Sequence, residues 1–389
     1  MHLDSAPLQT PSVRRAARHA EQTDEQTLAD QSDLTGVPAP PFQEEERGRL
    51  MARLMTGAGL EDVRADVVGN VFALRPGTSD LPPVVISAHL DTVFPPDTDV
   101  TVRRNGDLLE APGISDNGRG LAVILAVARA LEAGKVATEH PVLFAATVGE
   151  EGLGDLRGAR HFVGPSGAGH GAAAFISVDG AGLSHVVNQG LGSRRYRIRV
   201  RGPGGHSWLD RGTPNPIHAL ARVVHLVAFP PTPPGHEAAF TTARWGGGTS
   251  VNAIPQEAWI EVDCRSSSPR HLEALDRALR QAVEAAVSAE GEGLTSEVVS
   301  LGIRPAGSTD VHAPLIQAVR LATEAVGATP VMTLSSTDAN AAMAVGMPAV
   351  TMGGGGEAGL AHTTREWYRN VNGAAGVIRA IYTLALIAG

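Results

Sequence analysis

The sequence is poor in cysteine, in clustered basic residues and in long apolar runs. Its single cysteine, Cys264, excludes a disulfide within the chain, and nothing indicates an oxidising compartment. The net charge is -9 and Lys and Arg do not cluster, which argues against a surface for nucleic acids. Residues 1–26 lack the apolar central region of a signal peptide, so we expect a cytoplasmic protein. The apolar segment Val371–Gly389 contains Asn372 and Arg379, which indicates a packed terminal helix and not a membrane span.

The length and the pattern of apolar residues predict two domains. A chain of 389 residues is long for a single core. In residues 1–189 and 303–389, short apolar runs alternate with helical patterns, which predicts an α/β domain with a mixed, mostly parallel sheet flanked by helices. Residues 190–302 alternate charged and apolar positions and then carry a long helix, so we expect an inserted α+β domain there. Up to about Leu34 the chain is polar, and we expect one helix or a partly loose segment.

Two adjacent carboxylates, Glu150 and Glu151, follow one of the apolar runs. This run, Val142–Ala146, lies between Pro141 and Gly149, which is typical of a buried strand. Because neighbouring side chains of an extended segment point to opposite sides, one acid can bind a cation while the other transfers a proton. An isolated pair of this kind is more often a solvated turn, so its interpretation depends on what the other strand ends carry.

Other predicted strands also end in potential ligands. His89 and Asp91 follow the run Val84–Ile86, and Asp179 follows Phe175–Val178. Functional groups of parallel sheets gather beyond the carboxyl ends of the strands. We therefore expect these side chains to converge on one site, together with the two adjacent carboxylates.

The candidate ligands form a donor set that suits metal ions. They are nitrogen or carboxylate-oxygen donors without a thiolate: His89, Asp116, Glu151, Asp179 and His362. This set favours zinc, with manganese or cobalt less preferred. Five ligands are too many for one tetrahedral ion but suit two ions when one carboxylate bridges them. Asp116 is the best candidate for the bridge, because Gly113, Gly118 and Gly120 permit a close approach of the backbone.

Five short motifs containing these residues occur in order along the chain. They are Ser87-Ala88-His89-Leu90-Asp91-Thr92-Val93, Ser115-Asp116-Asn117-Gly118, Glu150-Glu151-Gly152, Val178-Asp179-Gly180 and Ala361-His362-Thr363. Together they resemble the co-catalytic zinc peptidase family that includes peptidase T, carboxypeptidase G, succinyl-diaminopimelate desuccinylase and acetylornithine deacetylase. The resemblance extends from about Leu34 to the C-terminus and includes the inserted domain. Each motif alone is weak, but all of them in order, with every ligand type intact, are a specific signal.

The resemblance implies a metal-dependent hydrolase that holds two Zn2+ per chain, with Mn2+ or Co2+ as alternatives. His89 and Asp179 would hold one ion, Glu151 and His362 would hold the other, and Asp116 would bridge the two. A carboxylate at the position of Asp179 is typical of the peptidases and deacetylases of the family. Members that act on allantoate or carbamoyl groups tend to have histidine there, so Asp179 argues against such substrates.

The resemblance also implies the catalytic groups. Glu150 would be the general base that takes a proton from the water bridging the two zinc ions and passes it to the leaving amine. Asp91 would lie behind His89 and fix its tautomer, the usual arrangement around a metal-binding histidine. His185 is close in sequence to Asp179 and is a less favoured alternative ligand.

The inserted domain carries three further candidates and resembles the lid of the family, which commonly forms the dimer interface. His206 matches a histidine that reaches the site of a partner subunit and stabilises the oxyanion. Asn252 matches a substrate-contacting loop, and Arg265 matches an arginine that binds a substrate carboxylate. Taken alone, His206 is as often a structural turn histidine, and Arg265 is more often part of a surface ion pair. The resemblance thus implies a homodimer formed through residues 190–302.

The motif around Asp338 bears on the substrate. Ser336-Thr337-Asp338-Ala339-Asn340 looks most like the peptidase T-like branch, which implies an exopeptidase of the aminopeptidase kind acting on short peptides. Ser335-Ser336 stand where that branch has glycines, and Ser207-Trp208 follows His206 where peptidase T has Pro-Gly. An N-acyl-amino-acid deacylase or a carboxypeptidase is the alternative within the family. A non-catalytic binding protein that retains the fold is the alternative from another class; lost ligands would indicate it, and none is lost.

Overall fold

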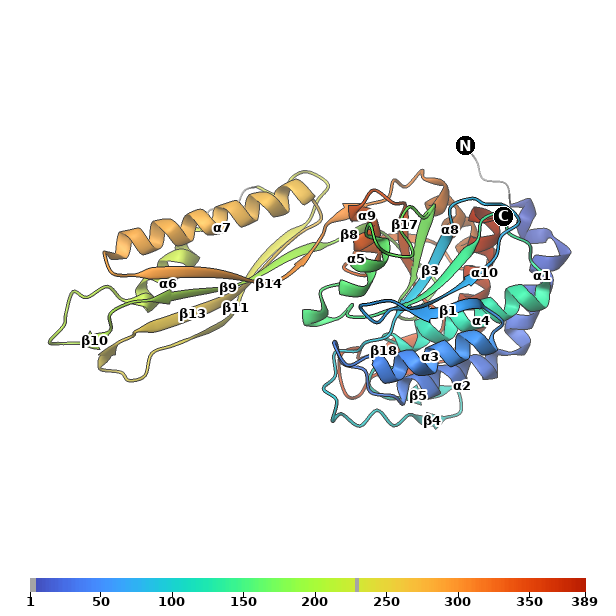
Figure 1. Ribbon diagram of the computed structural model, residues 1–389, viewed down its shortest axis with the longest axis horizontal. Coiled ribbons are helices and arrows are strands. Elements are labelled where there is room, and N and C mark those ends of the chain that lie inside the picture. The colour runs from blue at the N-terminus through green and yellow to red at the C-terminus, as the bar shows by residue number, and fades with distance from the viewer. Residues whose placement is uncertain (1–4, 228–230) are drawn as a thin grey trace. The chain divides into compact units, whose positions relative to one another are not determined.

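The computed structural model describes residues 5–227 and 231–389, which form two compact units (Figure 1). Unit 1 comprises Met1–Gly190 and Ser308–Gly389, and unit 2 comprises Leu191–Gly307. The chain therefore leaves unit 1 once and returns to it once, and unit 2 is an insertion into unit 1.

Within the described residues, unit 1 is built on a nine-stranded mixed sheet. Its strands are β1 (Glu61–Ala65), β2 (Val71–Arg75), β3 (Val84–His89), β6 (Val142–Thr147), β7 (Ala174–Val178), β8 (His185–Gly190), β15 (Gly307–Ser308), β16 (Val331–Ser335) and β17 (Ala349–Met352). The order is β1-β2-β6-β3-β7-β17-β8-β15, with β16 paired to β8. β6, β3, β7 and β17 run parallel, so their carboxyl ends meet at one edge. The predicted fold class, a mostly parallel sheet flanked by helices, is confirmed.

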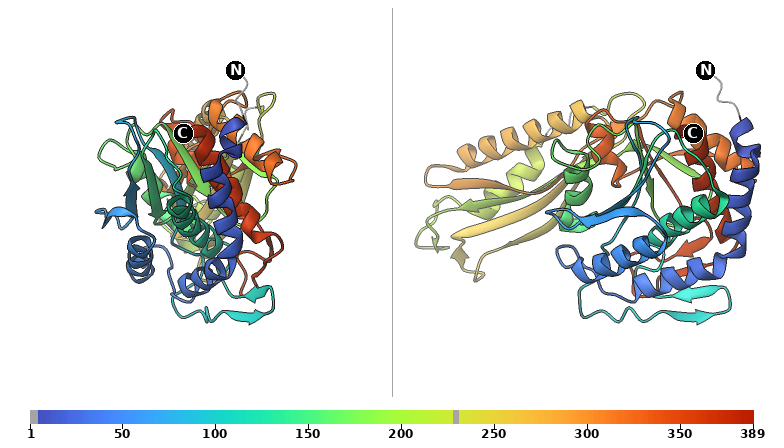
Figure 2. Two further views of the ribbon diagram at one scale, coloured as in Figure 1. Left: turned by 90° about the vertical axis from the view of Figure 1, so that its right-hand side faces the viewer. Right: turned by 45° about the vertical axis from the view of Figure 1, so that its right-hand side comes forward.

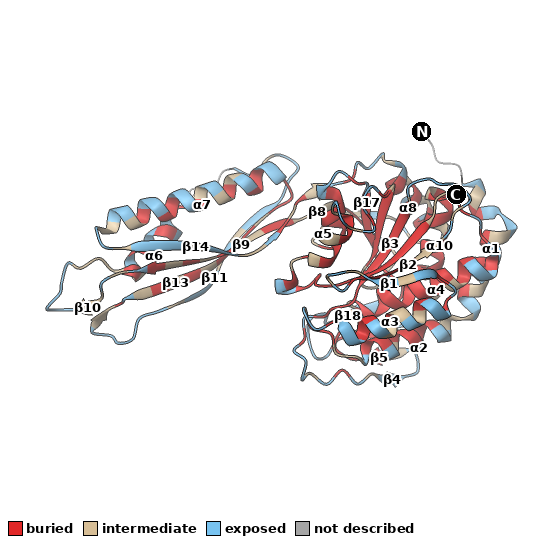
Figure 3. Ribbon diagram, viewed as in Figure 1, coloured by how far each residue is buried: buried red, intermediate tan, exposed pale blue. Residues whose placement is uncertain are grey.

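Helices cover both faces of this sheet because its strands are apolar on both sides. The helices of unit 1 are α1 (Pro11–Gln22), α2 (Asp24–Thr35), α3 (Glu45–Gly57), α4 (Gly118–Gly134), α5 (Arg157–Val163), α8 (Pro314–Ala325), α9 (Ala339–Ala344) and α10 (Gly373–Ile387). On β3, Val84 and Ile86 pack in the core that contains α1, α4, α8 and α10. Val85, between them, packs with α5 and α9 on the opposite face. Figure 3 shows β3 in the colour of buried residues.

The N-terminal segment differs from the expectation of one helix or a loose chain. It forms two helices, α1 and α2, and both contact α4 (Figure 2). Val13, Ala16 and Ala20 form a buried face on α1. At Gly134 of α4, an added Cβ would lie 2.8 Å from the Cβ of Ala16, so the two helices meet at small residues. The sequence appeared polar because this buried face consists mainly of alanine.

The predicted terminal helix is confirmed as α10, whose apolar side chains pack in the core of unit 1. Its buried Arg379 donates hydrogen bonds to the carbonyl oxygens of Leu183 and His185, the latter at 2.9 Å. Backbone carbonyls thus bind the two terminal nitrogens of this buried guanidinium, whereas its Nε has no hydrogen-bond partner among the described residues. Among the described residues, none of the helices combines the length and apolar character needed to cross a bilayer.

A second, smaller sheet in unit 1 was not among the predicted elements. Within the described residues it has four strands in the order β18-β19-β5-β4. They are β4 (Arg103–Asn105), β5 (Leu108–Glu110), β18 (Glu357–Gly359) and β19 (Trp367–Arg369). Each strand is too short to show an alternating pattern, and the β19–β5 pair joins segments that are far apart in sequence.

Unit 2 has a four-stranded antiparallel sheet, counted over its described residues, with helices on one face. The sheet order is β11-β13-β9-β14, and a two-residue pair, β10–β12, lies outside it. The elements are β9 (Gly192–Arg201), β10 (Gly205–His206), α6 (Pro216–Leu226), β11 (Ala238–Gly247), β12 (Ala253–Ile254), β13 (Glu257–Ser266), α7 (Pro269–Glu290) and β14 (Thr295–Arg304). Tyr196, Ile198 and Val200 of β9 pack against both helices, whereas Arg197 between them pairs with Glu261. The predicted sheet with one solvated face is confirmed.

Candidate metal centre

Five segments of unit 1 bring acids and histidines together beyond the carboxyl ends of the strands. His89 is the last residue of β3, Asp179 directly follows β7, and Glu151 lies in the turn after β6. Asp116 comes just before α4, and His362 lies in the segment between β18 and β19. His89, Asp116 and Glu151 each offer a ligand atom within 4.8 Å of the others, so these three can hold a metal ion.

The two oxygens of Asp116 face two different histidines. Its Oδ1 lies 3.1 Å from His89 Nε2, and its Oδ2 lies 3.1 Å from His362 Nε2. His89 Nε2 is also 3.6 Å from Asp179 Oδ1, and His362 Nε2 is 3.0 Å from Glu151 Oε1. The structure thus places the five predicted ligands as two histidine–carboxylate pairs with Asp116 between them.

Two polar atoms at the centre of this cluster fit a bound cation. His89 Nε2 and Asp116 Oδ1 are buried and have no hydrogen-bond partner among the described residues. Buried polar atoms in folded proteins are rarely left without partners. A cation coordinated by both atoms would satisfy them, and the nitrogen and carboxylate donors match the ligands that zinc and manganese accept.

The electrostatics of the cluster also favour positive charge at its centre. Burial opposes charging of His89, but the carboxylates of Asp116 and Asp179 outweigh it and hold the His89 pKa well above its ordinary value. Hydrogen bonds to Asp116 and Glu151 raise the pKa of His362 to about 10. Burial alone would raise the pKa of Asp116, yet the two histidines hold it below its ordinary value. A divalent ion at the histidine nitrogens would supply the positive charge that these carboxylates attract.

Asp91 differs in detail from its predicted arrangement. The main-chain carbonyl of Asp91, and not its carboxylate, accepts the hydrogen bond from His89 Nδ1, at 3.0 Å. The carboxylate lies 3.8 Å from Nδ1 and accepts hydrogen bonds from the backbone N–H groups of Glu150 and Glu151, at 2.9 and 2.8 Å. With its proton on Nδ1, His89 presents the lone pair of Nε2 to the cluster. Asp91 therefore orients a candidate ligand, His89, through its backbone, and it holds the backbone of the two glutamates through its side chain.

Asn70 also holds the turn that carries Glu150, and the sequence analysis did not assign it to the site. Its buried side chain accepts a hydrogen bond from Val148 N–H at 3.0 Å and donates one to the carbonyl of Gly158 at 3.0 Å. The same amide donates to Asp66 at 2.7 Å. The hairpin signal around Asn70 was visible in the sequence, but its contact with this turn was not.

Glu366 is a second residue that the sequence analysis did not identify. Its buried carboxylate accepts hydrogen bonds from the backbone N–H groups of Gly113, Ser115 and Asp116, at 3.0, 2.9 and 3.0 Å. The Ser115 hydroxyl donates a further bond, at 2.6 Å. Glu366 follows His362 by four residues. One short segment therefore supplies a candidate ligand, His362, and the carboxylate that holds the backbone around Asp116.

Replacing Glu366 with Gln is expected to lower metal affinity by about tenfold to a hundredfold, because the backbone around Asp116 loses an acceptor oxygen. Competition with a chromogenic chelator would measure this affinity. Glu284→Gln, at an exposed position on α7, is the matched control and should bind metal normally. Unchanged affinity in a folded Glu366→Gln protein would show that this carboxylate does not position Asp116.

A further buried carboxylate, Asp338, lies beneath the strand ends. Thr147, the last residue of β6, donates a hydrogen bond to one Asp338 oxygen, and the other has no hydrogen-bond partner among the described residues. Burial raises the pKa of Asp338 to about 6. The motif around Asp338 entered the sequence analysis only through its resemblance to one branch of the family.

In unit 2, His206 and Asn252 lie together at one end of the sheet. β10 and β12 pair His206 with Ala253, and Ser207 N–H donates to the carbonyl of Asn252 at 3.0 Å. His206 Nδ1 accepts hydrogen bonds from the backbone N–H groups of Trp208 and Leu209, at 3.1 and 3.3 Å. The neutral ring therefore carries its proton on Nε2, which leaves an N–H donor for an external acceptor.

Arg265 lies near the opposite end of β13, which runs from Glu257 to Ser266. Eight residues of extended chain separate it from Glu257, or about 27 Å. Its Nε donates to Asp263 at 2.9 Å, the ion pair expected from the sequence alone. Within unit 2, Arg265 and Asn252 therefore do not contribute to one subsite.

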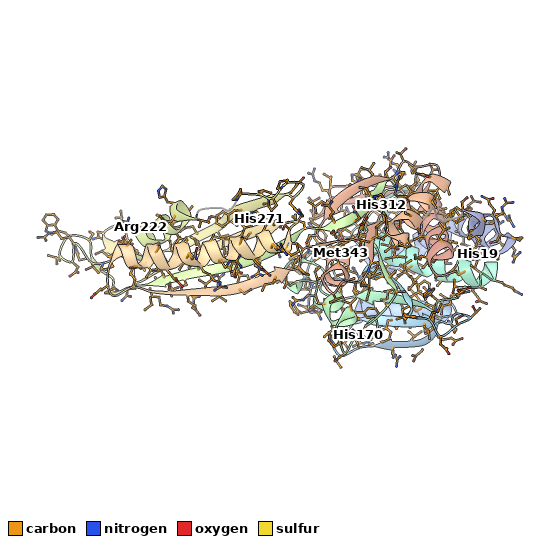
Figure 4. All side chains as sticks on the ribbon, turned by 90° about the horizontal axis from the view of Figure 1, so that it is seen from above. His19, His170, Arg222, His271, His312 and Met343 are labelled. Atoms are coloured by element: carbon orange, nitrogen blue, oxygen red, sulfur yellow. The ribbon has the colours of Figure 1, made fainter. Side chains whose placement is uncertain are left out.

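Several other histidines lie outside the cluster. His271 on α7 is buried and contacts Ser266, and His170 lies beyond α5 (Figure 4). His161 is 3.8 Å from Asp66, and His218 is 3.3 Å from Glu290. Of the described residues, none of these belongs to a group that could hold a metal ion.

Comparison with known proteins identifies the class to which this site and fold belong. The family described as Peptidase family M20/M25/M40 matches residues 85–387. The chain belongs to this family and is a hydrolase, as the five motifs predicted.

Particular relatives are similar to this chain at low identity, one in sequence and two in structure. The succinyl-diaminopimelate desuccinylase of Paracoccus denitrificans is 29% identical over 261 residues, which are 62% of this chain and 67% of the relative. The aminopeptidase PepT of Bacillus cereus has a similar structure, with a TM-score of 0.78, 21% identity and coverage of 94% of this chain and 99% of PepT. The YXEP protein of Bacillus subtilis, a dinuclear metal-binding peptidase of the M20 family, has a TM-score of 0.71, 19% identity and coverage of 94% and 98%.

Proposed function

We propose that this protein is a two-metal exopeptidase that hydrolyses amide bonds at an end of short peptides. The observation that carries the proposal is the position of Asp116, whose two oxygens face separate histidine–carboxylate pairs. Glu150 is a buried carboxylate that is not one of the five candidate ligands, and it directly precedes one of them, Glu151, in the chain. The dinuclear site named for the Bacillus subtilis relative and the aminopeptidase activity named for PepT support the same interpretation.

The predicted ligands would hold one ion between His89 and Asp179 and a second between Glu151 and His362, with Asp116 shared. When bound, two zinc ions, or manganese or cobalt, would supply Lewis-acid polarisation of the substrate carbonyl and would acidify a water molecule. His89 contributes through the hydrogen bond from its Nδ1 to the Asp91 carbonyl, which orients Nε2 toward the cluster.

Glu150 is the group that moves the proton in this proposal. It takes a proton from the attacking water and delivers it to the nitrogen of the leaving amine. Asp91 assists by fixing the backbone N–H groups of the Glu150–Glu151 turn, so that the two carboxylates keep their separate roles.

The residues of unit 2 would complete the site in a homodimer. The Nε2–H of His206 is a suitable donor to the developing oxyanion. Asn252 would contact the substrate beside it, and Arg265 would bind a substrate carboxylate. Arg265 is separated from His206 and Asn252 within unit 2, as expected if each site of the dimer contains residues from both subunits.

A panel of dipeptides, tripeptides and N-acyl amino acids, assayed after chelation and after return of zinc, manganese or cobalt, would test the function. Metal-dependent hydrolysis of the peptides is expected. Cleavage of N-acyl amino acids alone would establish the second candidate, a deacylase, which the desuccinylase relative favours. Metal binding without hydrolysis of any substrate would support a non-catalytic binding protein.

A further inference from the structure

A groove of about 500 Å³ in unit 1 has Asp116 in its wall. Its walls are mostly glycine and alanine, from the segments 180–182 and 356–361, with Ser115 and His185. This volume lies within the range of small-ligand sites. Because walls of small residues leave the backbone accessible, the groove is suited to a ligand that is recognised through its main chain.

Strand β18 forms one wall of this groove and is an edge strand. Glu357, Ala358 and Gly359 all line the groove, and β18 is the terminal strand of the β18-β19-β5-β4 sheet. Of the described residues that line the groove, none belongs to β19, the neighbour of β18. The groove therefore lies against β18 and away from β19, its partner strand.

An edge strand has backbone N–H and C=O groups without a partner strand, and this holds for either of the two hydrogen-bond patterns that it can form with its neighbour. In an antiparallel pair, the N–H and C=O of alternate residues point toward the partner, and those of the intervening residues point away. If Ala358 bonds to β19, then Glu357 and Gly359 point outward, and in the other register Ala358 does. Either way, at least one N–H and one C=O of β18 face the groove.

We propose that the substrate binds as an extended peptide strand, pairing with the open edge of β18 while its scissile carbonyl lies beside Asp116 in the wall of the groove. This inference rests on the proposed function and narrows its substrate class to chains with at least one peptide group besides the scissile one. Backbone pairing gives affinity without selecting side chains. The enzyme would then prefer tripeptides to N-acyl amino acids.

Hydrogen exchange tests the pairing directly. The metal-loaded Glu150→Gln protein is saturated with trialanine, and amide exchange is followed in segment 355–366. The proposal expects at least one β18 amide to exchange about tenfold more slowly with trialanine and to be unaffected by N-acetylalanine. Unchanged β18 exchange at saturating trialanine would overturn it.

Kinetics with modified peptides provide an independent test on the unmodified enzyme. Trialanine is compared with an analogue methylated at the nitrogen of its non-scissile peptide bond, with product analysis to establish which bond is cut. Loss of one backbone hydrogen bond is expected to lower kcat/KM by about tenfold. Equal rates for both peptides would contradict strand pairing while leaving the proposed hydrolase intact. Failure to cleave any peptide or N-acyl amino acid would count against the proposed function itself.

A protein variant tests the position of the groove. Ala358 is exposed, so Ala358→Leu should fold normally and narrow the groove. We expect KM for trialanine to rise about tenfold and KM for N-acetylalanine to remain the same. Ala285→Leu, at an exposed alanine on α7, is the matched control. An equal effect of Ala358→Leu on both substrates would exclude β18 from recognition of the second peptide group.

Discussion

Glu150→Gln is expected to lower kcat by about a hundredfold to ten-thousandfold while metal content stays unchanged. Glutamine has nearly the same shape as glutamate but cannot accept and return a proton. Because Asp91 fixes the turn through backbone N–H groups, the substitution does not remove the bonds that hold it. Steady-state kinetics together with metal analysis by mass spectrometry would measure the two quantities.

The Glu284→Gln variant is the matched control for this experiment, since it makes the same chemical change at an exposed position of unit 2. Its activity should equal that of the unmodified protein. Near-normal turnover of Glu150→Gln would remove this residue from the role of general base. Loss of metal together with activity would instead place Glu150 among the ligands.

Asp116→Ala is expected to lower the metal content from two ions per chain to one or none, and activity by at least about a hundredfold. The reason is geometric: both oxygens of Asp116 face a histidine of a different pair, at 3.1 Å each. No other carboxylate among the described residues contacts both His89 and His362 in this way. Metal per chain, measured after dialysis against buffered zinc, is the primary readout.

An Asp99→Ala variant provides the control, because Asp99 is an exposed carboxylate that pairs with Arg103 outside the cluster. Circular dichroism of both variants would establish that each remains folded. An Asp116→Ala protein that still binds two ions per chain would refute the shared carboxylate. Retention of one tightly bound ion would show that one histidine–carboxylate pair can bind metal without the bridge.

The candidate ligands were accessible from the sequence because each lies close to a recognisable local signal. Glu151 and Asp179 follow apolar runs that could be identified as buried strands, and the parallel arrangement of those strands places their ends at one edge. His362 also follows an apolar run, Pro348–Met352, but at a distance, after the glycines 353–356. It was found through its motif and the resemblance.

The supporting residues were not accessible in the same way. Glu366 and Asn70 act through hydrogen bonds to backbone groups that lie 250 and 78 residues away in the chain, respectively. Such hydrogen bonds leave no periodic pattern in the sequence, because any side chain with an acceptor oxygen at the right position could bind these backbone N–H groups. The three-residue strand β18 is likewise defined only by its pairing with β19.

The sequence by itself determined the α/β class of unit 1, the α+β class of the insertion and the chemical types of the five candidate ligands. These follow from local properties, namely the periodicity of apolar residues and the identity of the donors. Only the tertiary structure decided that Asp116 lies between two histidines, that the Asp91 carbonyl orients His89 and that β18 borders an open groove. Those relations depend on distances between segments remote in sequence, which the packing of the sheet and its helices sets.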